Sequence, residues 1–195
     1  MRASQPLTPD LLVSAYAQGI FPMDVAGRIE WFSPDPRGIL PLEAFHISDN
    51  LRRLCARRKF QIRVNTRFRD VMTACADRRE GTWISQEIIA AYTRLHERGL
   101  AHSVETWLDD ELAGGLYGVA LGGAFFGESM FHRVRDASKV ALVHLVERLK
   151  TRGYMLLDVQ FVTPHLRRFG AVEIPRREYL RRLRAALARP CRFVD

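Results

Sequence analysis

The chain has 195 residues, with 30 Lys and Arg against 22 Asp and Glu, which leaves a net charge of +8. Hydrophobic residues make up 47%, enough for one substantial core, and this excludes an intrinsically disordered chain. The positive excess favours an anionic partner such as nucleic acid, without identifying one. The longest uncharged run, Leu112–Gly127, is too short and too rich in glycine to cross a bilayer. The first residues also lack the apolar stretch of a signal peptide, so we expect a cytoplasmic protein with no membrane partner.

The first predicted helix lies near the N-terminus. Thr8 can cap it, Pro9 suits its first position, and Gly19 can end it. The following stretch, Ile20–Leu42, is rich in proline, glycine and tryptophan and cannot form one long element. It predicts short strands and turns in a small lobe of its own.

The rest of the chain alternates between helical and strand-like patterns. Further helices are predicted at Asp49–Arg58, Arg67–Arg79, after Ser85 up to Gly99, at Lys139–Lys150, briefly after Gln160, and near Glu178–Ala188. Strands are predicted at Phe60–Val64, Ala101–Trp107, Glu111–Leu121, Ala124–Phe131 and Tyr154–Gln160. From Ala101 onward, the predicted order is three successive strands, a helix, a strand and a helix. This order indicates an α+β domain with a mixed sheet. By analogy, this order also suits an acetyltransferase-like fold.

Neither the cysteines nor the histidines indicate a metal site. The three cysteines, Cys55, Cys75 and Cys191, are odd in number and far apart, which excludes a disulfide framework and a zinc ribbon. The six histidines show no HxxxH or HExxH spacing. The glycines between Gly114 and Gly127 match neither GxGxxG nor a P-loop, so they do not indicate a nucleotide site. We therefore predict no metal, no cofactor and no covalent intermediate.

Two apolar strands carry polar side chains that need an explanation. Glu128 stands among Phe126, Met130 and Phe131, and a carboxylate in such surroundings is either paired or functional. Asp158 and Gln160 are two residues apart in a predicted strand, so their side chains should share one face. The pair can be a helix cap or a buried hydrogen-bonded pair. Alternatively, it can orient an amine and stabilise a developing oxyanion.

With these features in place, the sequence resembles the leucyl/phenylalanyl-tRNA–protein transferase family. The resemblance covers almost the whole chain, and the joint occurrence of its segments in order is specific. The segments that carry it are Tyr16–Met23, Trp31–Arg37, Gly81–Ile84, Ala91–His96, Ala101–Glu105, Gly114–Val119, Gly127–Phe131, Ala137–Lys139, Leu157–Gln160 and Phe169–Arg176.

The resemblance implies an enzyme that moves Leu or Phe from aminoacyl-tRNA to the α-amino group of proteins with N-terminal Arg or Lys, in the N-degron pathway. It implies a small N-terminal domain, residues 1–46, and an acetyltransferase-like (GNAT-like) domain with a mixed sheet, residues 47–195. Glu128, Asp158 and Gln160 match the polar residues of the family's catalytic centre. Nothing in the chain demands more than a monomer.

The reaction is aminolysis of an ester, for which proximity and charge stabilisation are the main needs. Asp158 is the better candidate to receive the amine proton, with Gln160 positioning the amine or the carbonyl. Glu128 can bind the cationic side chain of the acceptor or orient its amine. A variant assisted by a ribose hydroxyl of the tRNA stays open, and the sequence does not decide among these roles.

Two further sets of residues have expected binding roles. The apolar side chain of the donor amino acid needs a pocket. Five residues are candidates to line it, and each can instead be an ordinary core residue: Trp83, Met130, Phe126, Trp31 and Phe32. A basic cluster can follow the phosphates of the tRNA acceptor stem: Arg52, Arg53, Arg57, Arg58 and Lys59. A second cluster, between Arg176 and Arg184, is better explained as a solvated helix face.

Two other functions compete with the transferase. An acyl-CoA-dependent N-acyltransferase of the GNAT type would need a glycine-containing pyrophosphate loop before the helix at Lys139–Lys150, and the segment His132–Lys139 lacks those glycines. A non-catalytic RNA-binding module would leave every activity unchanged when Asp158 or Gln160 is replaced by alanine.

Overall fold

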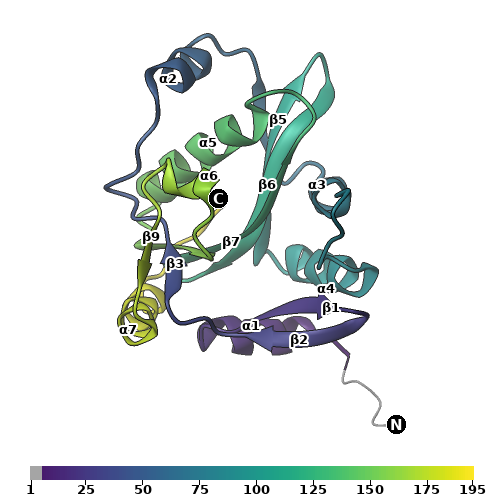
Figure 1. The fold of residues 1–195 in the computed structure, drawn as a ribbon, viewed down its shortest axis with the longest axis vertical. Helices are drawn as coiled ribbons and strands as arrows, with labels where there is room; N and C mark the ends of the chain where they lie inside the picture. Colours follow the sequence, from purple (N-terminus) through teal and green to yellow (C-terminus); the bar gives the residue numbers. More distant parts are fainter. Residues whose placement is uncertain (1–5) are drawn as a thin grey trace.

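The computed structural model describes residues 6–195, which form two sheets, with helices on both faces of the larger one (Figure 1). The smaller sheet is an antiparallel hairpin of β1 (Phe21–Val25) and β2 (Arg28–Phe32). The larger sheet has seven strands in the order β4-β5-β6-β7-β8-β3-β9. Its strands are β3 (Arg37–Ile39), β4 (Gln61–Val64), β5 (Ala101–Leu108), β6 (Glu111–Leu121), β7 (Ala124–His132), β8 (Leu156–Gln160) and β9 (Val172–Ile174). Because β7 and β8 run parallel while the other pairs are antiparallel, the predicted mixed sheet is confirmed.

The helices are α1 (Pro9–Ala17), α2 (Asp49–Ala56), α3 (Phe68–Ala76), α4 (Gln86–Glu97), α5 (Ala137–Thr151), α6 (Pro164–Arg167) and α7 (Arg176–Leu187). In residues 6–195, four helices (α1, α2, α4 and α6) begin after a Ser or Thr whose hydroxyl caps them. The hydroxyl of Thr8 accepts the backbone N–H of Leu11, and the hydroxyl of Ser48 accepts that of Leu51. The predicted helices and strands are thus confirmed, whereas no pattern in the sequence predicts β9.

Two hydrophobic cores lie on opposite faces of the large sheet. Leu142 and Leu145 of α5 pack in one core with Leu157 of β8. Tyr16 of α1 and Tyr92 of α4 belong to the other core. Figure 1 shows α5 on one side of the sheet and α3 and α4 on the other. Side chains that alternate along a central strand therefore enter different cores.

The N-terminal segment is interleaved with the large sheet. β3 lies between β8 and β9, and α1 contacts α4 and α7. The hairpin is tied to the loop before α4, since the N–H of Asp24 donates to the carbonyl of Trp83. A domain division at residue 46 stays a prediction, and residues before it contribute both a strand of the sheet and a helix of the core.

A β-bulge at Glu128 changes which side chains share a face. Tyr117 of β6 is opposite Ser129, but the next residue, Gly118, is opposite Gly127, so Glu128 has no residue opposite it in the register. As a result, Phe126 enters the core of α1 and α4, while Met130 packs against the core of α5. The apolar residues on either side of Glu128 are therefore divided between the two faces of the sheet.

Gly118 lies at this bulge, and we expect Gly118→Ala to destabilise the fold by about 1–3 kcal/mol. A Cβ at Gly118 would fall on the carbonyl oxygen of Phe126 and against the ring of Phe125, both of which are held in the sheet. Gly127 is the matched control, because a Cβ there would have its nearest contact at 3.6 Å, with the carbonyl of Asp158. Urea denaturation of the two variants tests this, and equal losses would contradict it.

Candidate functional site

A cavity of about 830 Å³ lies where β7 and β8 separate. The two strands pair only where Ala124–Phe126 lie beside Leu156–Asp158, and β7 then continues with β6 as its one partner among the described strands. The cavity is lined from β1, β7 and β8, the start of α5, and the loop between α3 and α4. Glu128 and Gln160 both line it, so the structure brings two of the three predicted catalytic side chains to one space.

The cavity has two chemically different walls. The wall on the α5 face is aliphatic and consists of Leu116, Met130, Leu142, Leu145 and Leu157. The wall on the opposite face carries Phe21, Trp83, Tyr117 and Glu128. The first wall suits an apolar ligand group, and the second can also form hydrogen bonds.

Two of the five residues predicted to line the donor pocket are at this cavity, and three are not. Trp83 and Met130 line the cavity. Phe126 is fully buried and packs on the ring of Tyr16, with centroids 4.8 Å apart. Phe32 stacks on Phe21 in the hairpin, and Trp31 is 40% exposed. Over residues 6–195, the structure does not place Phe126, Trp31 or Phe32 on the cavity surface.

Glu128 is held by hydroxyl and amide donors. The hydroxyl of Tyr16 donates to Oε1 of Glu128 at 2.7 Å, and Nε2 of Gln160 lies 3.4 Å from the same oxygen. The hydroxyl of Tyr92 is in turn hydrogen-bonded to that of Tyr16. Burial raises the pKa of Glu128 to about 8; the Tyr16 hydrogen bond lowers it, the charge of Asp158 raises it, and Arg37 lowers it. A carboxyl group that titrates near neutrality can exchange protons with an amine.

Both carboxylate oxygens of Asp158 accept hydrogen bonds from other side chains of the protein. Nε and Nη2 of Arg37 donate to its two oxygens at 2.9 and 2.6 Å, and the hydroxyl of Tyr179 donates at 2.7 Å. Both Asp158 and Arg37 are buried. The guanidinium of Arg37 also donates to the carbonyl of Gly19 at 2.9 Å. The Asp158 carboxylate is therefore a fixed, paired charge rather than a free base.

Gln160 reaches the cavity through an irregular backbone. Its φ is 56°, in the left-handed region, and β8 is bulged so that Gly38 is opposite Gln160 while Ile39 is opposite Asp158. Oδ1 of Asp158 accepts the backbone N–H of Gln160 at 2.9 Å and so supports this conformation. Asp158 consequently points to Arg37 and Tyr179, whereas Gln160 points into the cavity. Both side chains still lie on the face of the sheet that carries Tyr16 and Tyr179, as expected, because Tyr179 bonds Asp158 while Gln160 contacts the Glu128 that Tyr16 holds.

Several residues of the site were missed by the sequence reasoning. Tyr16 and Tyr92 support Glu128, and Arg37 and Tyr179 support Asp158. Arg37, Tyr16 and Tyr92 lie in segments that carry the family resemblance, which was the signal available for them. Tyr179 looks like an ordinary apolar-face residue of a helix, and no local pattern marks its hydroxyl group.

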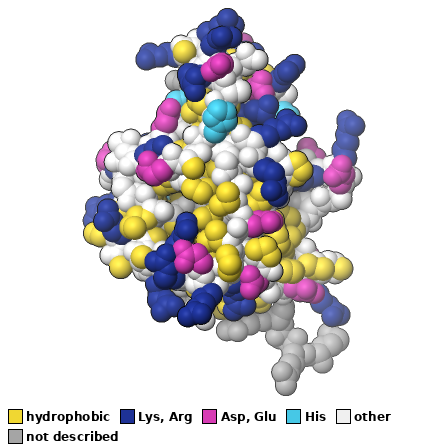
Figure 2. All heavy atoms as spheres, turned by 60° about the vertical axis from the view of Figure 1, so that its left-hand side comes forward, with side chains coloured by type: hydrophobic (Ala, Val, Ile, Leu, Met, Phe, Trp, Pro, Cys, Tyr) yellow, Lys and Arg dark blue, Asp and Glu magenta, His cyan; other side chains and the backbone are white. Residues whose placement is uncertain are grey.

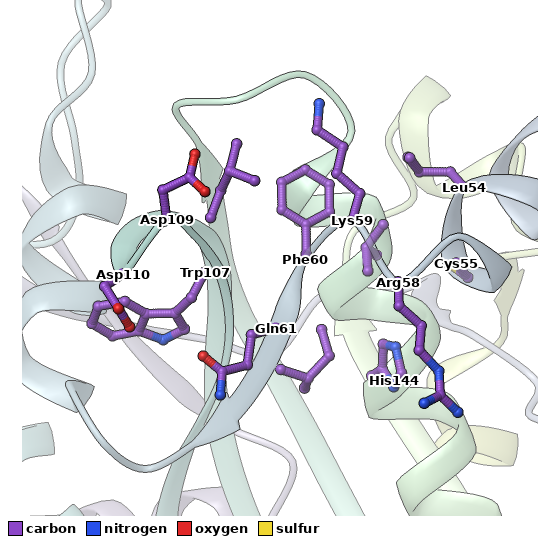
Figure 3. A pocket seen from close by; sticks show the side chains of 13 residues that line it. Leu54, Cys55, Arg58, Lys59, Phe60, Gln61, Trp107, Asp109, Asp110 and His144 are labelled. Carbon is purple, nitrogen blue, oxygen red and sulfur yellow. The ribbon is translucent and has the colours of Figure 1, made fainter.

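The predicted tRNA-binding cluster lies elsewhere, on α2 and the turn after it. Figure 2 shows basic side chains gathered at the end of the molecule that carries α2. A second cavity, of about 630 Å³, opens beside this turn. Figure 3 shows Arg58 and Lys59 on one side of it and Asp109 and Asp110 on the other. The cluster does not line the cavity of Glu128.

Within the described range, no three His, Cys, Asp or Glu side chains come together as a set that could hold a metal ion. In the same range, no helix has the length and apolarity that a membrane crossing requires.

Comparison with known proteins gives one consistent family. Residues 39–184 match the family model described as leucyl/phenylalanyl-tRNA protein transferase, and residues 5–35 match the model of its N-terminal domain. The leucyl/phenylalanyl-tRNA–protein transferase of Herpetosiphon aurantiacus is 60% identical, over 93% of this chain and 95% of that protein. The same-named protein of Gloeobacter violaceus is 59% identical, over 96% of this chain and 97% of that protein. Among solved structures, a ribosomal-protein-alanine N-acetyltransferase from Brucella melitensis has a TM-score of 0.39 at 16% identity, over 55% of this chain and 85% of that chain.

Proposed function

The chain belongs to the leucyl/phenylalanyl-tRNA–protein transferase family, and from this we propose that it transfers Leu or Phe from aminoacyl-tRNA to the α-amino group of proteins beginning with Arg or Lys. The observation that carries the proposal is the cavity in which Glu128 and Gln160 lie beside an aliphatic wall. The sheet with one parallel pair that parts at the cavity supports an acetyltransferase-like fold for the larger domain.

The aliphatic wall is the place for the donor side chain. Leu142, Leu145 and Leu157 come from α5 and β8, and Met130 closes the wall from β7. Burying a Leu or Phe side chain against such a surface contributes about 1.5–3 kcal/mol. Met130 has a flexible thioether, which adapts to both ligand shapes.

The polar side chains then act at the reacting ester. The neutral α-amine of the acceptor attacks the ester carbonyl, so that a C–N bond forms and the C–O bond to the ribose breaks. The carboxylate of Glu128 takes the proton that the amine loses, and this proton ends on the departing ribose oxygen. The raised pKa of Glu128, about 8, is close to that of an α-amino group. Proton transfer between the two groups is therefore nearly balanced.

In this scheme Asp158 is a positioning residue. Its oxygens accept from Arg37, from Tyr179 and from the backbone of Gln160, so it holds Gln160 in its left-handed conformation. Of the roles that the sequence left open, the geometry favours Glu128 over Asp158 as proton acceptor, because Glu128 lines the cavity.

The basic cluster of α2 supplies the general attraction for the RNA. Its members are exposed cations near one end of the molecule: Arg52, Arg53, Arg57, Arg58 and Lys59. Phosphate contacts of this kind carry little sequence information and weaken with salt.

Transfer of labelled leucine tests the proposal. With charged Leu-tRNA, we expect a peptide beginning with Arg to be labelled at least about tenfold faster than one beginning with Asp, as the proposed acceptor class requires. Labelling of neither peptide by folded protein would contradict the proposal. Saturable binding of coenzyme A together with such a failure would instead favour the acyl-CoA-dependent alternative.

A further inference from the structure

A group of cationic and imidazole side chains surrounds the mouth of the Glu128 cavity. It comes from the end of β7, the loop that follows, the first turn of α5, α6 and the residue after α6. We name it the cationic rim: His132, Arg135, Lys139, His165 and Arg168. All except Arg168 line the cavity. The side chain of Arg135 is 95% exposed and that of Lys139 is 39% exposed, so the rim faces solvent as well as the cavity.

The members of the rim act on one another electrostatically. Burial lowers the pKa of His165, and the charges of Lys139, Arg168 and His132 lower it further. Nε2 of His165 is shielded from solvent, and no described residue forms a hydrogen bond with it. Asp136 offsets part of the charge, because Lys139 Nζ lies 2.6 Å from one of its oxygens and Arg135 Nε lies 3.7 Å from the other.

The backbone adds to this positive site. α5 has 15 residues, and its first turn, which includes Ser138 and Lys139, lines the cavity. In the described part of the chain, no side chain caps this end of the helix: Asp136, at the N-cap, has a φ of 67° and its side chain forms no cap hydrogen bond. The first amide groups of a helix are donors with a favourable dipole for an anion. Side chains and backbone at the mouth therefore favour the same kind of ligand, a compact anion with several acceptor oxygens.

We propose that the cationic rim binds the phosphodiester that joins the last two nucleotides of the donor tRNA. The inference rests on the proposed function, in which the ester of the terminal nucleoside lies at Glu128 and Gln160. The chain of the RNA must then leave through the cavity mouth, and the first phosphate it carries passes the rim. The site is separate from the basic cluster of α2, which we assign to the acceptor stem of the tRNA.

Three leucyl donor substrates of increasing length distinguish the contact with this phosphodiester from contacts with the rest of the RNA. Leucyl-adenosine carries no phosphodiester, the leucyl ester of the dinucleotide CpA carries one, and Leu-tRNA carries the whole molecule. We expect wild-type protein to prefer the dinucleotide to the nucleoside. In Arg135→Ala/Lys139→Ala, the ratio of kcat/KM for the dinucleotide to that for the nucleoside should fall about tenfold, since charge-assisted contacts are lost. The salt dependence of dinucleotide use should weaken as well.

Arg184→Ala, an exposed arginine of α7 outside the cavity, is the matched control and should keep the wild-type ratio. The single variant Arg135→Ala, whose side chain is almost fully exposed, keeps the test valid if loss of Lys139 disturbs α5. An unchanged ratio in Arg135→Ala and in a folded double variant would overturn the proposal. If wild-type protein uses none of the three donors, the proposed function itself fails instead.

Discussion

Replacing Glu128 by glutamine is expected to lower kcat for leucine transfer by about 100-fold or more at pH 8, because the variant lacks the carboxylate that takes the amine proton. The substituted side chain keeps its volume, so the KM for Leu-tRNA should change little. Glu147→Gln is the matched control, since Glu147 is exposed on α5 and pairs with His144. A Glu128→Gln variant with wild-type kcat would show that the proton leaves by another route.

The same substitution has a second, independent readout in stability. Glu128 has an ordinary pKa of 4.5 in the unfolded chain and about 8 in the folded protein, so the folded state binds more protons between these values. Wild-type stability should therefore fall as pH rises from about 4.5 through 8. Glu128→Gln removes this dependence of stability on pH. The melting temperature of the variant, relative to that of wild type, should therefore rise between about pH 5 and pH 9. A constant difference would mean that the pKa is not raised.

The largest effect on stability is expected at Arg37. Arg37→Met leaves the buried carboxylate of Asp158 without its cation, and removal of one partner of a buried ion pair costs about 3–5 kcal/mol. Arg52→Met is the matched control, because its ion pair with Asp49 is exposed on both sides and should contribute less than about 1 kcal/mol. Chemical denaturation measures both variants.

The double variant Arg37→Met/Asp158→Leu separates the lost charge balance from lost packing. If the unpaired carboxylate causes the destabilisation, the double variant should recover much of the stability that Arg37→Met loses. Similar losses in Arg37→Met and Arg52→Met would contradict the assignment of Asp158 as a fixed, paired charge.

Local patterns predicted most of the secondary structure. The apolar residues of α5 recur at helical spacing, and Thr8 and Ser48 begin helices as their capping chemistry requires. β9 was missed because it has three residues, two of them exposed, so no alternation marks it. The position of β3 between β8 and β9 could not be predicted either, because it depends on pairing with strands more than about a hundred residues later in the chain.

The sequence reasoning identified residues of the candidate site better than it predicted how they are arranged. Glu128 and Gln160 stood out as polar side chains in apolar strands, and both line the cavity. The bulge at Glu128 and the left-handed backbone of Gln160 were not predicted, because neither leaves a mark in the local sequence pattern. Asp158 is withdrawn from the cavity by Arg37, a contact across 121 positions of the chain. Such long-range pairing leaves no periodic signal in the sequence.

The role of Glu128 as proton acceptor is tested most directly by the rate of leucine transfer to a peptide beginning with Arg, measured for wild type and Glu128→Gln between about pH 6 and pH 9.5. Titration of the peptide amine affects both proteins equally, so the ratio of the wild-type rate to the variant rate reports the ionised fraction of Glu128 alone. We predict that this ratio rises about tenfold per pH unit below pH 8 and levels off above it, as expected for a carboxyl group with a pKa of about 8. A ratio that stays constant across the range, or wild-type protein that transfers no leucine, would contradict this role.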